Sequence, residues 1–350
     1  MSNSGIAWTE KTWSPVTGCT KVSAGCKNCY AEREVEGRWS KNPKSVFFGR
    51  AFTDVQVHEN QLMAPMKWKE AHRIFVCPRG DLFHESVSFE FLDWVFATMA
   101  LASQHTFQVL TKRPERMLEY IAKHTQDGVM VRAARDVLTT TMPMPKGHQI
   151  QPFQWPLPNV WIGVTVENQE AADERIPLLL QTPAAVRWLS MEPLLGAVDL
   201  SYAFGTGKGS CPMHLAGIAP EGLLPKGEHH LHWVVSGGES GPNARPMHPD
   251  WARGLRDQCA AVAVPFLFKQ WGEWGPHQAR AGGDEGGDLR RGHVRYLQGD
   301  GREPDGHFRK GDAAVARVGT KTAGRLLNGV LHDNYPESSH GDYPLAAIAN

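Results

Sequence analysis

The sequence predicts an α/β fold in which strands and helices alternate along the chain, and three observations support this prediction. Short apolar runs recur without clean polar alternation, as expected for strands that are covered on both faces. Helical patterns lie between several of these runs, which is typical of βαβ units built around a parallel sheet. We count about six or seven such units, with one of them around the cysteines near the N-terminus. We therefore expect an incomplete (β/α) TIM-like barrel with insertions and a C-terminal extension.

Each expected strand leads into a polar or glycine-rich segment. The expected strands cover residues 73–77, 106–110, 160–166, 186–190, 232–236 and 264–268. Four helices are expected between them, at Phe89–Ser103, Pro114–Lys123, Asn168–Gln181 and Pro249–Ala263. In the first of these, apolar residues recur close to the 3.6-residue period of a helix with one buried face. The second begins with a proline directly after a strand, which is a helix-start signal.

The expected barrel covers residues 1–274, and residues 275–350 form an extension packed on it. Two stretches interrupt the alternation. Residues 124–158 contain a proline-rich segment, and residues 201–231 are rich in glycine, proline and histidine, so both are interpreted as insertions. The extension is rich in glycine and charge, and we expect it to fold as small strands and turns over one end of the barrel.

Composition excludes several classes of protein. Hydrophobic residues make up 41% and charged residues 21% of the 350 residues, which is typical of a globular protein. No apolar run approaches the roughly 20 residues that span a bilayer, and no signal peptide is recognised, so we expect a cytoplasmic protein without membrane association. The 37 basic and 37 acidic residues give a formal net charge of zero. Binding of nucleic acid through bulk charge is therefore not indicated, although a local basic groove stays open.

The most informative motif is a run of three cysteines, Cys19, Cys26 and Cys29, with the spacing C-x6-C-x2-C. In a chain without export signals, clustered cysteines are more often ligands or catalysts than disulfides. Three thiolates on one metal centre leave a coordination position for a small molecule, which favours an iron–sulfur cluster. The alternative is a structural zinc site completed by a distant residue. Zinc sites usually show a second pair of ligands at short spacing, and the sequence has none that fits.

Polar side chains follow each expected strand. In a parallel βα architecture ligands bind at the C-terminal ends of the strands, so these side chains should converge there with the cysteine loop. They are Asp81, His84, Glu85, Lys112, Arg113, Glu167, Asn168, Glu192, Ser236, Glu239, Lys269 and Gln270. Trp271, directly after the last strand, is either a core residue or a platform on which a nucleobase stacks.

Several blocks of the chain resemble the three-Cys-motif proteins of phages, the Gp37/Gp68 family (DUF5131). They are the segments 6–19 and 26–32 around the cysteines, 81–85, 110–114, 161–168, 189–194, 237–241, 269–272 and 324–329. This family is similar to the radical S-adenosylmethionine enzymes, whose usual spacing is C-x3-C-x2-C. Here the gap between Cys19 and Cys26 is longer, whereas the gap between Cys26 and Cys29 fits.

The resemblance implies a partial barrel of the radical S-adenosylmethionine type with a 4Fe–4S cluster on Cys19, Cys26 and Cys29. The fourth iron would then bind the amino and carboxylate groups of S-adenosylmethionine, and a flavodoxin or ferredoxin would supply the electron. Residues expected to bind the cofactor are Asp81, Lys112, Glu167, Asn168, Glu192 and Glu239. Residues expected to bind the substrate are Arg113, Lys269, Gln270 and Trp271.

The substrate implied by the association with phages is a nucleic-acid base. We expect modification or isomerisation of a hypermodified pyrimidine in phage DNA, which would evade host restriction in the host cytoplasm. Such a base must leave the duplex stack before its carbon can react. Radical repair of a nucleic-acid lesion and RNA modification are alternatives within the same chemistry. The alternative from another class is a zinc-stabilised accessory protein that binds nucleic acid without catalysis.

Overall fold

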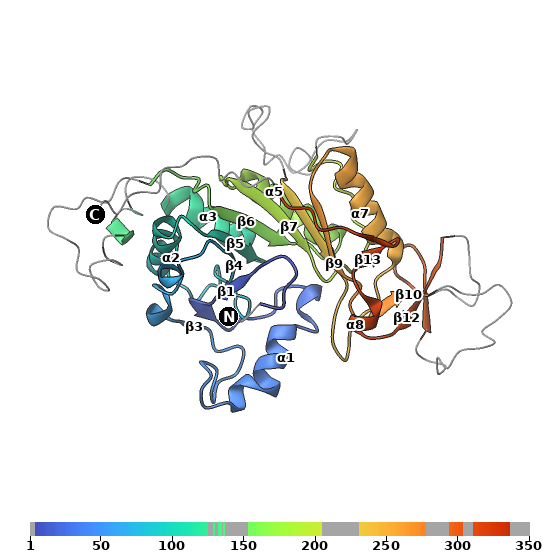
Figure 1. Cartoon of the computed structure of the whole chain (residues 1–350), viewed down its shortest axis with the longest axis horizontal. Helices are drawn as coiled ribbons and strands as arrows, with labels where there is room; N and C mark the ends of the chain where they lie inside the picture. Colours follow the sequence, from blue (N-terminus) through green and yellow to red (C-terminus); the bar gives the residue numbers. More distant parts are fainter. Residues whose placement is uncertain are drawn as a thin grey trace.

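The computed structural model describes residues 4–124, 129, 132–134, 136, 153–204, 231–277, 294–303 and 311–336. Its centre is a curled seven-stranded sheet in which all neighbouring strands are parallel (Figure 1). The strands follow one another across the sheet in chain order: β1 (Lys11–Trp13), β4 (Arg73–Val76), β5 (Thr106–Thr111), β6 (Val160–Thr165), β7 (Val186–Met191), β8 (Trp233–Gly237) and β9 (Phe266–Gln270). A parallel sheet wound in one direction is compatible with an incomplete (β/α) barrel, whereas a doubly wound sheet reverses its strand order.

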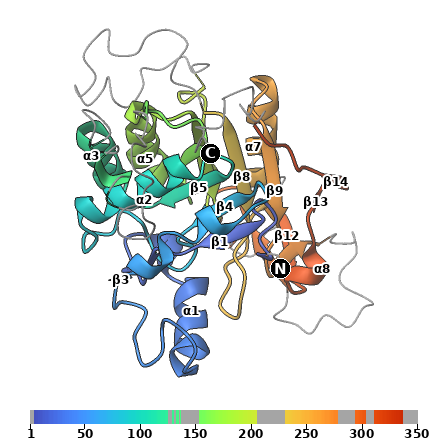
Figure 2. The same ribbon diagram turned by 60° about the vertical axis from the view of Figure 1, so that its left-hand side comes forward.

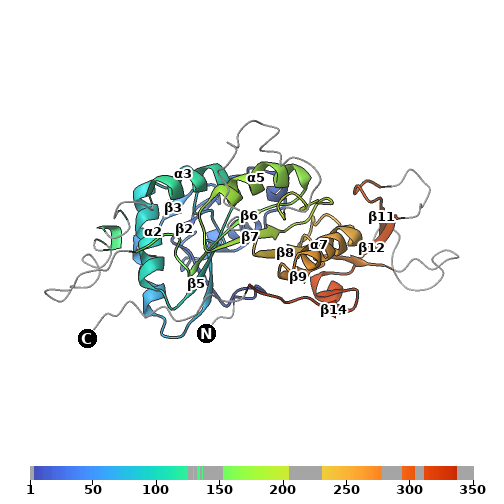
Figure 3. The same ribbon diagram turned by 90° about the horizontal axis from the view of Figure 1, so that it is seen from above.

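Helices cover the outer face of this sheet (Figures 1 and 3). They are α2 (Phe89–Leu101), α3 (Pro114–His124), α5 (Gln169–Gln181) and α7 (Pro249–Ala261), each placed between two consecutive strands of the sheet. The expected strands and helices are confirmed, with ends that differ by no more than two residues. Ser88 caps α2 by accepting a hydrogen bond from the N–H of Phe91, at 3.2 Å.

The cysteines lie in the loop after β1. This loop contains the short 3-10 helix η1 (Ala24–Cys26) and ends at helix α1 (Tyr30–Gly37). Three further 3-10 helices, η2 (Trp39–Lys41), η3 (Glu59–Gln61) and η4 (Pro65–Lys67), and a two-stranded sheet of β2 (Val16–Thr17) and β3 (Gln56–Val57) lead back to β4. Helix α1 and the loop that follows it project from the body of the sheet (Figure 2).

The two faces of the sheet carry separate cores, which explains the apolar runs without alternation. On β6, Val160, Ile162 and Val164 point outward into the main core with the helices. On the inner face, Trp161 joins a second cluster that includes Trp188 on β7. The remaining buried members of this inner cluster are Trp8, Phe75, Val186, Trp233, Val235 and Leu267. Because both faces are buried, every strand position between the edges favours apolar residues.

The C-terminal extension contains small strands, as expected. An antiparallel sheet is formed by β10 (Trp274–Pro276), β11 (Val294–Leu297) and β12 (Ala313–Arg317), and it is followed by α8 (Thr320–Ala323) and a hairpin of β13 (Leu326–Leu327) and β14 (Val330–Leu331). The chain then follows the free edge of β9, where the N–H of Phe268 donates to the carbonyl of His332 at 2.9 Å. The extension is therefore packed on the last strand of the sheet.

Most of the two expected insertions, 124–158 and 201–231, lies outside the described residues. Among the residues that the structure describes, no helix has both the length and the apolar character needed to cross a bilayer.

Candidate functional site

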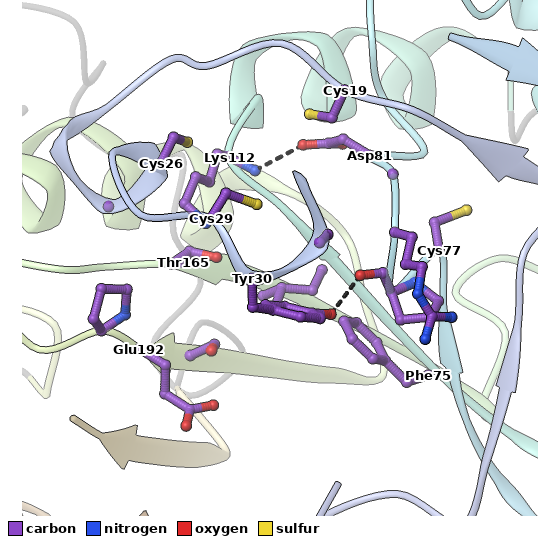
Figure 4. A pocket seen from close by; sticks show the side chains of 18 of the residues that line it. Cys19, Cys26, Cys29, Tyr30, Phe75, Cys77, Asp81, Lys112, Thr165 and Glu192 are labelled. Atoms are coloured by element: carbon purple, nitrogen blue, oxygen red, sulfur yellow. Dashed lines mark hydrogen bonds between the residues drawn. The ribbon is translucent and has the colours of Figure 1, made fainter. Parts of the chain in front are cut away.

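A cavity of about 510 Å³ lies at the C-terminal ends of the parallel strands (Figure 4). Most of the expected site residues line it: Cys19, Cys26, Cys29, Asp81, Lys112, Arg113, Glu192, Glu239, Lys269 and Gln270. Glu167, Asn168 and Trp271 are not among the lining residues. The convergence of strand-end side chains on the cysteine loop, which the fold class implied, is therefore present.

The three cysteines belong to one loop and are free thiols, each partly accessible. Cys29 is the N-cap residue of α1, and Cys26 closes η1. In the view of Figure 4, the three side chains lie on one side of the cavity, Glu192 lies on the other, and the ring of Tyr30 lies between them. The Tyr30 hydroxyl donates a hydrogen bond to the carbonyl of Pro78, which fixes the ring across the cavity.

The sequence left two kinds of metal centre open for the three thiols, a structural zinc site and an iron–sulfur cluster. In the described part of the chain, no group of three or more His, Cys, Asp or Glu residues is arranged to hold one metal ion. A zinc ion needs about four donors, with its sulfurs about 2.3 Å from a single point. In a cluster each thiolate binds a different iron, so the sulfurs surround a larger volume. The three thiols of one loop, which line an open cavity, match the donor type and number of a cluster that has one iron free.

Lys112 and Asp81 influence the thiols in opposite directions. Burial alone would raise the pKa of the Cys26 thiol, but the Lys112 ammonium and hydrogen bonds from Val22 and Ser23 bring it below its usual value. Burial and the Asp81 carboxylate raise the pKa of Cys19 to about 11, and the nearby Arg113 offsets only part of this effect. Metal binding would have to deprotonate Cys19, and the Arg113 guanidinium is placed to stabilise the resulting thiolate.

Arg113 holds the first part of the cysteine loop. Its guanidinium donates to the Cys19 sulfur at 3.5 Å and to the Thr20 hydroxyl at 2.9 Å. The same group is paired with Asp81 at 3.2 Å and with Glu85 at 3.2 Å. All of its donor groups are occupied and it is buried. Arg113 was expected to bind substrate; the structure instead places it as a clamp on the cysteine loop.

Asp81 is occupied in the same way. Its carboxylate accepts hydrogen bonds from the Thr111 hydroxyl at 2.7 Å and from the backbone N–H groups of Phe83 and Lys112 at 3.0 and 3.2 Å. Together with the pair to Arg113, these bonds use the accepting capacity of both oxygens. Asp81 lines the cavity, but its contacts orient Arg113 and the backbone at Lys112.

Glu167 contacts the middle of the cysteine loop. It is buried, accepts from the N–H of Gly25 at 3.2 Å, and forms an ion pair with Arg175 at 2.9 Å. Burial would raise the pKa of this carboxyl, but Arg175, the Ser23 hydroxyl, Lys112 and the Gly25 N–H together lower it. Glu167 therefore remains ionised and anchors the loop next to Cys26, instead of facing the cavity.

Glu239 holds the end of the loop. It accepts from the side-chain amide of Asn28 at 3.0 Å and from the Arg245 guanidinium at 2.6 Å. Arg245 also donates to the carbonyl of Ala24 at 3.0 Å. Glu239 was expected to bind the cofactor; in the structure its carboxylate contacts Arg245 and Asn28.

The two glycines before Glu239 are needed for space. A Cβ at Gly237 would lie 2.6 Å from a carboxylate oxygen of Glu192, and a Cβ at Gly238 would lie 1.9 Å from the backbone carbonyl oxygen of Trp271. Neither distance is sterically allowed. Gly237 therefore makes room for Glu192, and Gly238 lets the exits of β8 and β9 approach closely.

Two expected residues have other contacts. Asn168 caps α5, since its side-chain oxygen accepts from the N–H of Ala171 at 3.0 Å. Trp271 is buried, packs edge-on against Phe268 with ring centroids 4.9 Å apart, and donates to the carbonyl of Leu326 at 2.9 Å. These placements give Asn168 a capping role and Trp271 a core role, because neither side chain faces the cavity.

The groups that remain directed at the cavity are Lys112 and the strand-end residues opposite the cysteines. Among the described residues, the Lys112 ammonium forms no ion pair, although its charge acts on Cys26 and Glu167. Glu192 and Lys269 form an ion pair at 3.1 Å. The cavity also contacts the inner tryptophan cluster through Trp8 and Phe75, together with Ile6 and Leu110 at its edge.

Sequence reasoning missed Arg245, Tyr30 and the apolar base of the cavity. Tyr30 directly follows the last cysteine, so its proximity was readable from the chain. Arg245 lies six residues beyond Glu239 in an irregular loop, and no local pattern marks it. Trp8 and Phe75 became visible only when the inward face of each strand was known.

Comparison with known proteins agrees with the family resemblance. A search of curated proteins gave no match to this chain, and a search of solved structures likewise gave none. The family model described as "Protein of unknown function (DUF5131)" matches residues 3–336, which is nearly the whole chain. The protein therefore belongs to the DUF5131 family.

Proposed function

We propose that this protein is a radical S-adenosylmethionine enzyme in which Cys19, Cys26 and Cys29 hold a 4Fe–4S cluster. One observation carries the proposal: three free thiols of a single loop line one side of a cavity at the C-terminal ends of parallel strands. One iron would then be open to the amino and carboxylate groups of the cofactor.

When bound, the cluster would supply one-electron chemistry, in which an electron from a flavodoxin or ferredoxin would cleave the sulfonium C–S bond of S-adenosylmethionine into methionine and a 5′-deoxyadenosyl radical for hydrogen abstraction. The chain contributes position and charge. Arg113, Glu167 and Glu239 fix the cysteine loop at its two ends and its middle. Lys112 places a positive charge beside Cys26, where an anionic carboxylate of the cofactor would be favoured.

The substrate we propose is a base in nucleic acid, with modification or isomerisation of a hypermodified pyrimidine in phage DNA as the leading case. The cavity volume of about 510 Å³ lies in the range of small-molecule sites and could admit a base together with part of the cofactor. Trp8 and Phe75 supply aromatic surface at its base. The Glu192–Lys269 pair offers an acceptor and donors to a heterocycle on the side opposite the cysteines.

Anaerobic purification tests the chemistry directly. We expect a brown protein with about four irons per chain. On reduction with dithionite it should convert S-adenosylmethionine to 5′-deoxyadenosine and methionine. The Cys26→Ala variant should lose iron and cleavage, whereas Cys259→Ala, which alters a buried thiol in α7 away from the cavity, should keep the iron. A colourless protein with one zinc per chain would reject the proposal in favour of a structural zinc site.

The substrate is tested separately by nucleoside mass spectrometry. DNA and RNA from cells that express the wild-type protein should contain a nucleoside that is missing when the Cys26→Ala variant is expressed, in a host that makes the precursor base. Identical nucleoside profiles would reject a nucleic-acid substrate while leaving the cofactor chemistry untouched. A change confined to RNA would select RNA modification over DNA modification.

A further inference from the structure

The loop after α1 forms a basic arm with apolar side chains at its surface. We define the basic arm as residues 38–50. No acidic residue occurs between Glu36 and Asp54, so the arm carries only positive charge. Its exposed cations are Arg38, Lys41 and Lys44. Because the whole chain has a formal net charge of zero, this concentration of one sign is a local feature.

The arm is ordered by its own hydrogen bonds. The N–H of Gly49 donates to the carbonyl of Ser40 at 2.9 Å, which closes the arm across its width. The N–H of Lys44 donates to the Asn42 side chain at 3.0 Å. Arg50 is paired with Asp54 at 2.8 Å, so it stabilises the base of the arm and is not free for a partner.

Two neighbouring phenylalanines in the arm have opposite environments. Phe47 is 2% exposed and joins Ala31, Val35 and Phe52 in a small core. Phe48 is 54% exposed, and Val46, on the other side of Phe47 in the chain, is 51% exposed. Phe47 already anchors the arm, so the exposure of Phe48 does not reflect a missing core. One exposed apolar side chain is ordinary, but two beside exposed cations on one short arm indicate a contact surface.

The arm is joined to the candidate site at both ends. Its small core also packs against Cys19 and Cys29, and Ala31 and Phe52 line the cavity as well. Figures 1 and 2 show α1 and the loop after it projecting from the sheet, and α1 begins directly after Cys29. A molecule held by the arm would therefore lie next to the mouth of the cavity.

We propose that the basic arm binds a nucleic-acid strand beside the cavity, with phosphates on Arg38, Lys41 and Lys44 and a base stacked on Phe48. This inference rests on the proposed function for its substrate class. Cations alone would fit an acidic redox protein equally well. An exposed aromatic ring between basic residues favours a base, since every base offers a face for stacking. Buried Trp271 cannot provide that surface, and the arm can.

Binding of a short, fluorescently labelled single-stranded DNA, followed by anisotropy over a range of salt concentrations, tests the proposal. The double variant Lys41→Ala/Lys44→Ala should weaken binding and lower the salt-dependence slope by about 1.4, since each phosphate contact to a single strand contributes about 0.7. Phe48→Ala should weaken binding about fivefold or more without changing that slope. Phe48→Trp should restore it. The slope of affinity against salt thus distinguishes the phosphate contacts of the lysines from base stacking on Phe48.

Matched controls lie elsewhere on the surface. Lys67→Ala/Lys69→Ala removes two exposed lysines near η4, and Leu331→Ala removes an exposed apolar side chain on β14. Both should bind DNA like the wild type. Arm variants that bind normally, or controls that lose as much affinity, would overturn the proposal. So would arm variants that keep DNA binding but are no longer reduced by flavodoxin, because the surface would then belong to a redox partner.

Different measurements test the proposed radical chemistry and the proposed role of the basic arm. Cluster content and reductive cleavage of S-adenosylmethionine are measured on wild-type protein without DNA, and their absence would reject the proposed chemistry. DNA binding is measured by anisotropy and needs no turnover. A wild-type protein that cleaves the cofactor but binds no oligonucleotide would overturn only the role of the arm.

Discussion

Carboxylates of similar position in this protein have different roles, which depend on the cation that each one meets. Glu167 meets the buried Arg175 and holds Gly25, whereas Glu192 meets the partly exposed Lys269 at the cavity wall. Breaking a buried pair leaves an uncompensated charge, whereas a cation that still reaches solvent is partly compensated by water. The two residues should therefore respond differently to the same substitution.

For Glu167→Gln we expect a loss of about 3 kcal/mol in the free energy of unfolding, because Arg175 would be left buried without a counter-charge. Glu192→Gln should cost less stability than Glu167→Gln, because the partly exposed Lys269 can still reach water, and it should instead weaken activity or ligand binding. Urea unfolding of both variants gives the comparison. Equal losses of stability would contradict the assignment of Glu167 to the loop and Glu192 to the cavity.

The pH dependence of stability should show the same difference. The pKa of Glu167 is lowered in the folded protein, so its contribution to stability is present above the unfolded value of 4.5 and is lost as the pH falls through the folded pKa. The stability difference between wild type and Glu167→Gln should therefore shrink as the pH is lowered below about 4.5. Chemical unfolding at several pH values measures it, and a constant difference would contradict the low folded pKa.

The order of the strands predicted where the site residues lie, but it did not predict which contacts each residue makes. The C-terminal edge of a parallel sheet brought Asp81, Lys112, Glu192 and Glu239 to one cavity, as predicted. Whether a carboxylate is free to bind a ligand depends on side chains that reach it from other loops. Arg245 is such a side chain, because it donates to Glu239. Spacing along the chain contains no information about those approaches. The three cysteines line the same cavity because all three belong to one short loop.

The turn after β8 is the element with the tightest packing in the site. Gly238 lies against the carbonyl of Trp271, and its N–H donates to the carbonyl of Gln270 at 2.9 Å. This contact joins the exits of β8 and β9. Flexible side chains can move away from an added methyl group, but a backbone carbonyl directly after a paired strand can do so only by shifting the ends of the two strands.

Gly238→Ala should therefore cost about 3 kcal/mol or more, and it should disturb the Glu239 contacts to the cysteine loop. Gly254→Ala is the matched control, because a Cβ at Gly254 meets no atom within 4 Å and the residue lies inside α7. That variant should gain about 0.5–1 kcal/mol from helix propensity. Thermal unfolding of the two variants shows whether Gly238→Ala lowers stability and Gly254→Ala raises it. A harmless Gly238→Ala would contradict the close approach of the two strands.

Elements with two buried faces or a clear helical period were predicted within two residues, from Arg73–Val76 to Phe266–Gln270. The element before the cysteine loop, β1, was expected without bounds, and the basic arm was not assigned as an element. β1 has three residues, which is too short to show a period, and the arm is held by turns and side-chain bonds that leave no repeating pattern. Long, regular elements can be predicted from a single sequence, whereas short ones depend on tertiary contacts.

At the scale of the molecule, the half-barrel is closed differently at its two ends. At the C-terminal ends of the strands, the cysteine loop is held by residues that follow β5, β6 and β8. At the opposite end, the chain after β14 spans the gap between the edge strands. Asn334 donates to the carbonyl of Phe266 on β9 at 3.3 Å, and Tyr335 donates to the carbonyl of Ala7, shortly before β1, at 3.1 Å.

Tyr335 is the residue on which this second closure depends most. Its ring lies 5.3 Å from that of Trp233 and 4.2 Å from the Arg73 guanidinium carbon, so it covers the inner tryptophan cluster while it links the sheet edges. Tyr335→Ala should cost about 2 kcal/mol through the lost aromatic and cation–π contacts. Leu331→Ala, an exposed position in the same segment, should cost almost nothing. Hydrogen exchange measured by mass spectrometry should show faster exchange at both β1 and β9 in the Tyr335 variant. Faster exchange at β9 alone would mean that the segment only covers an edge, because a true link between the edges must loosen both strands when it is cut.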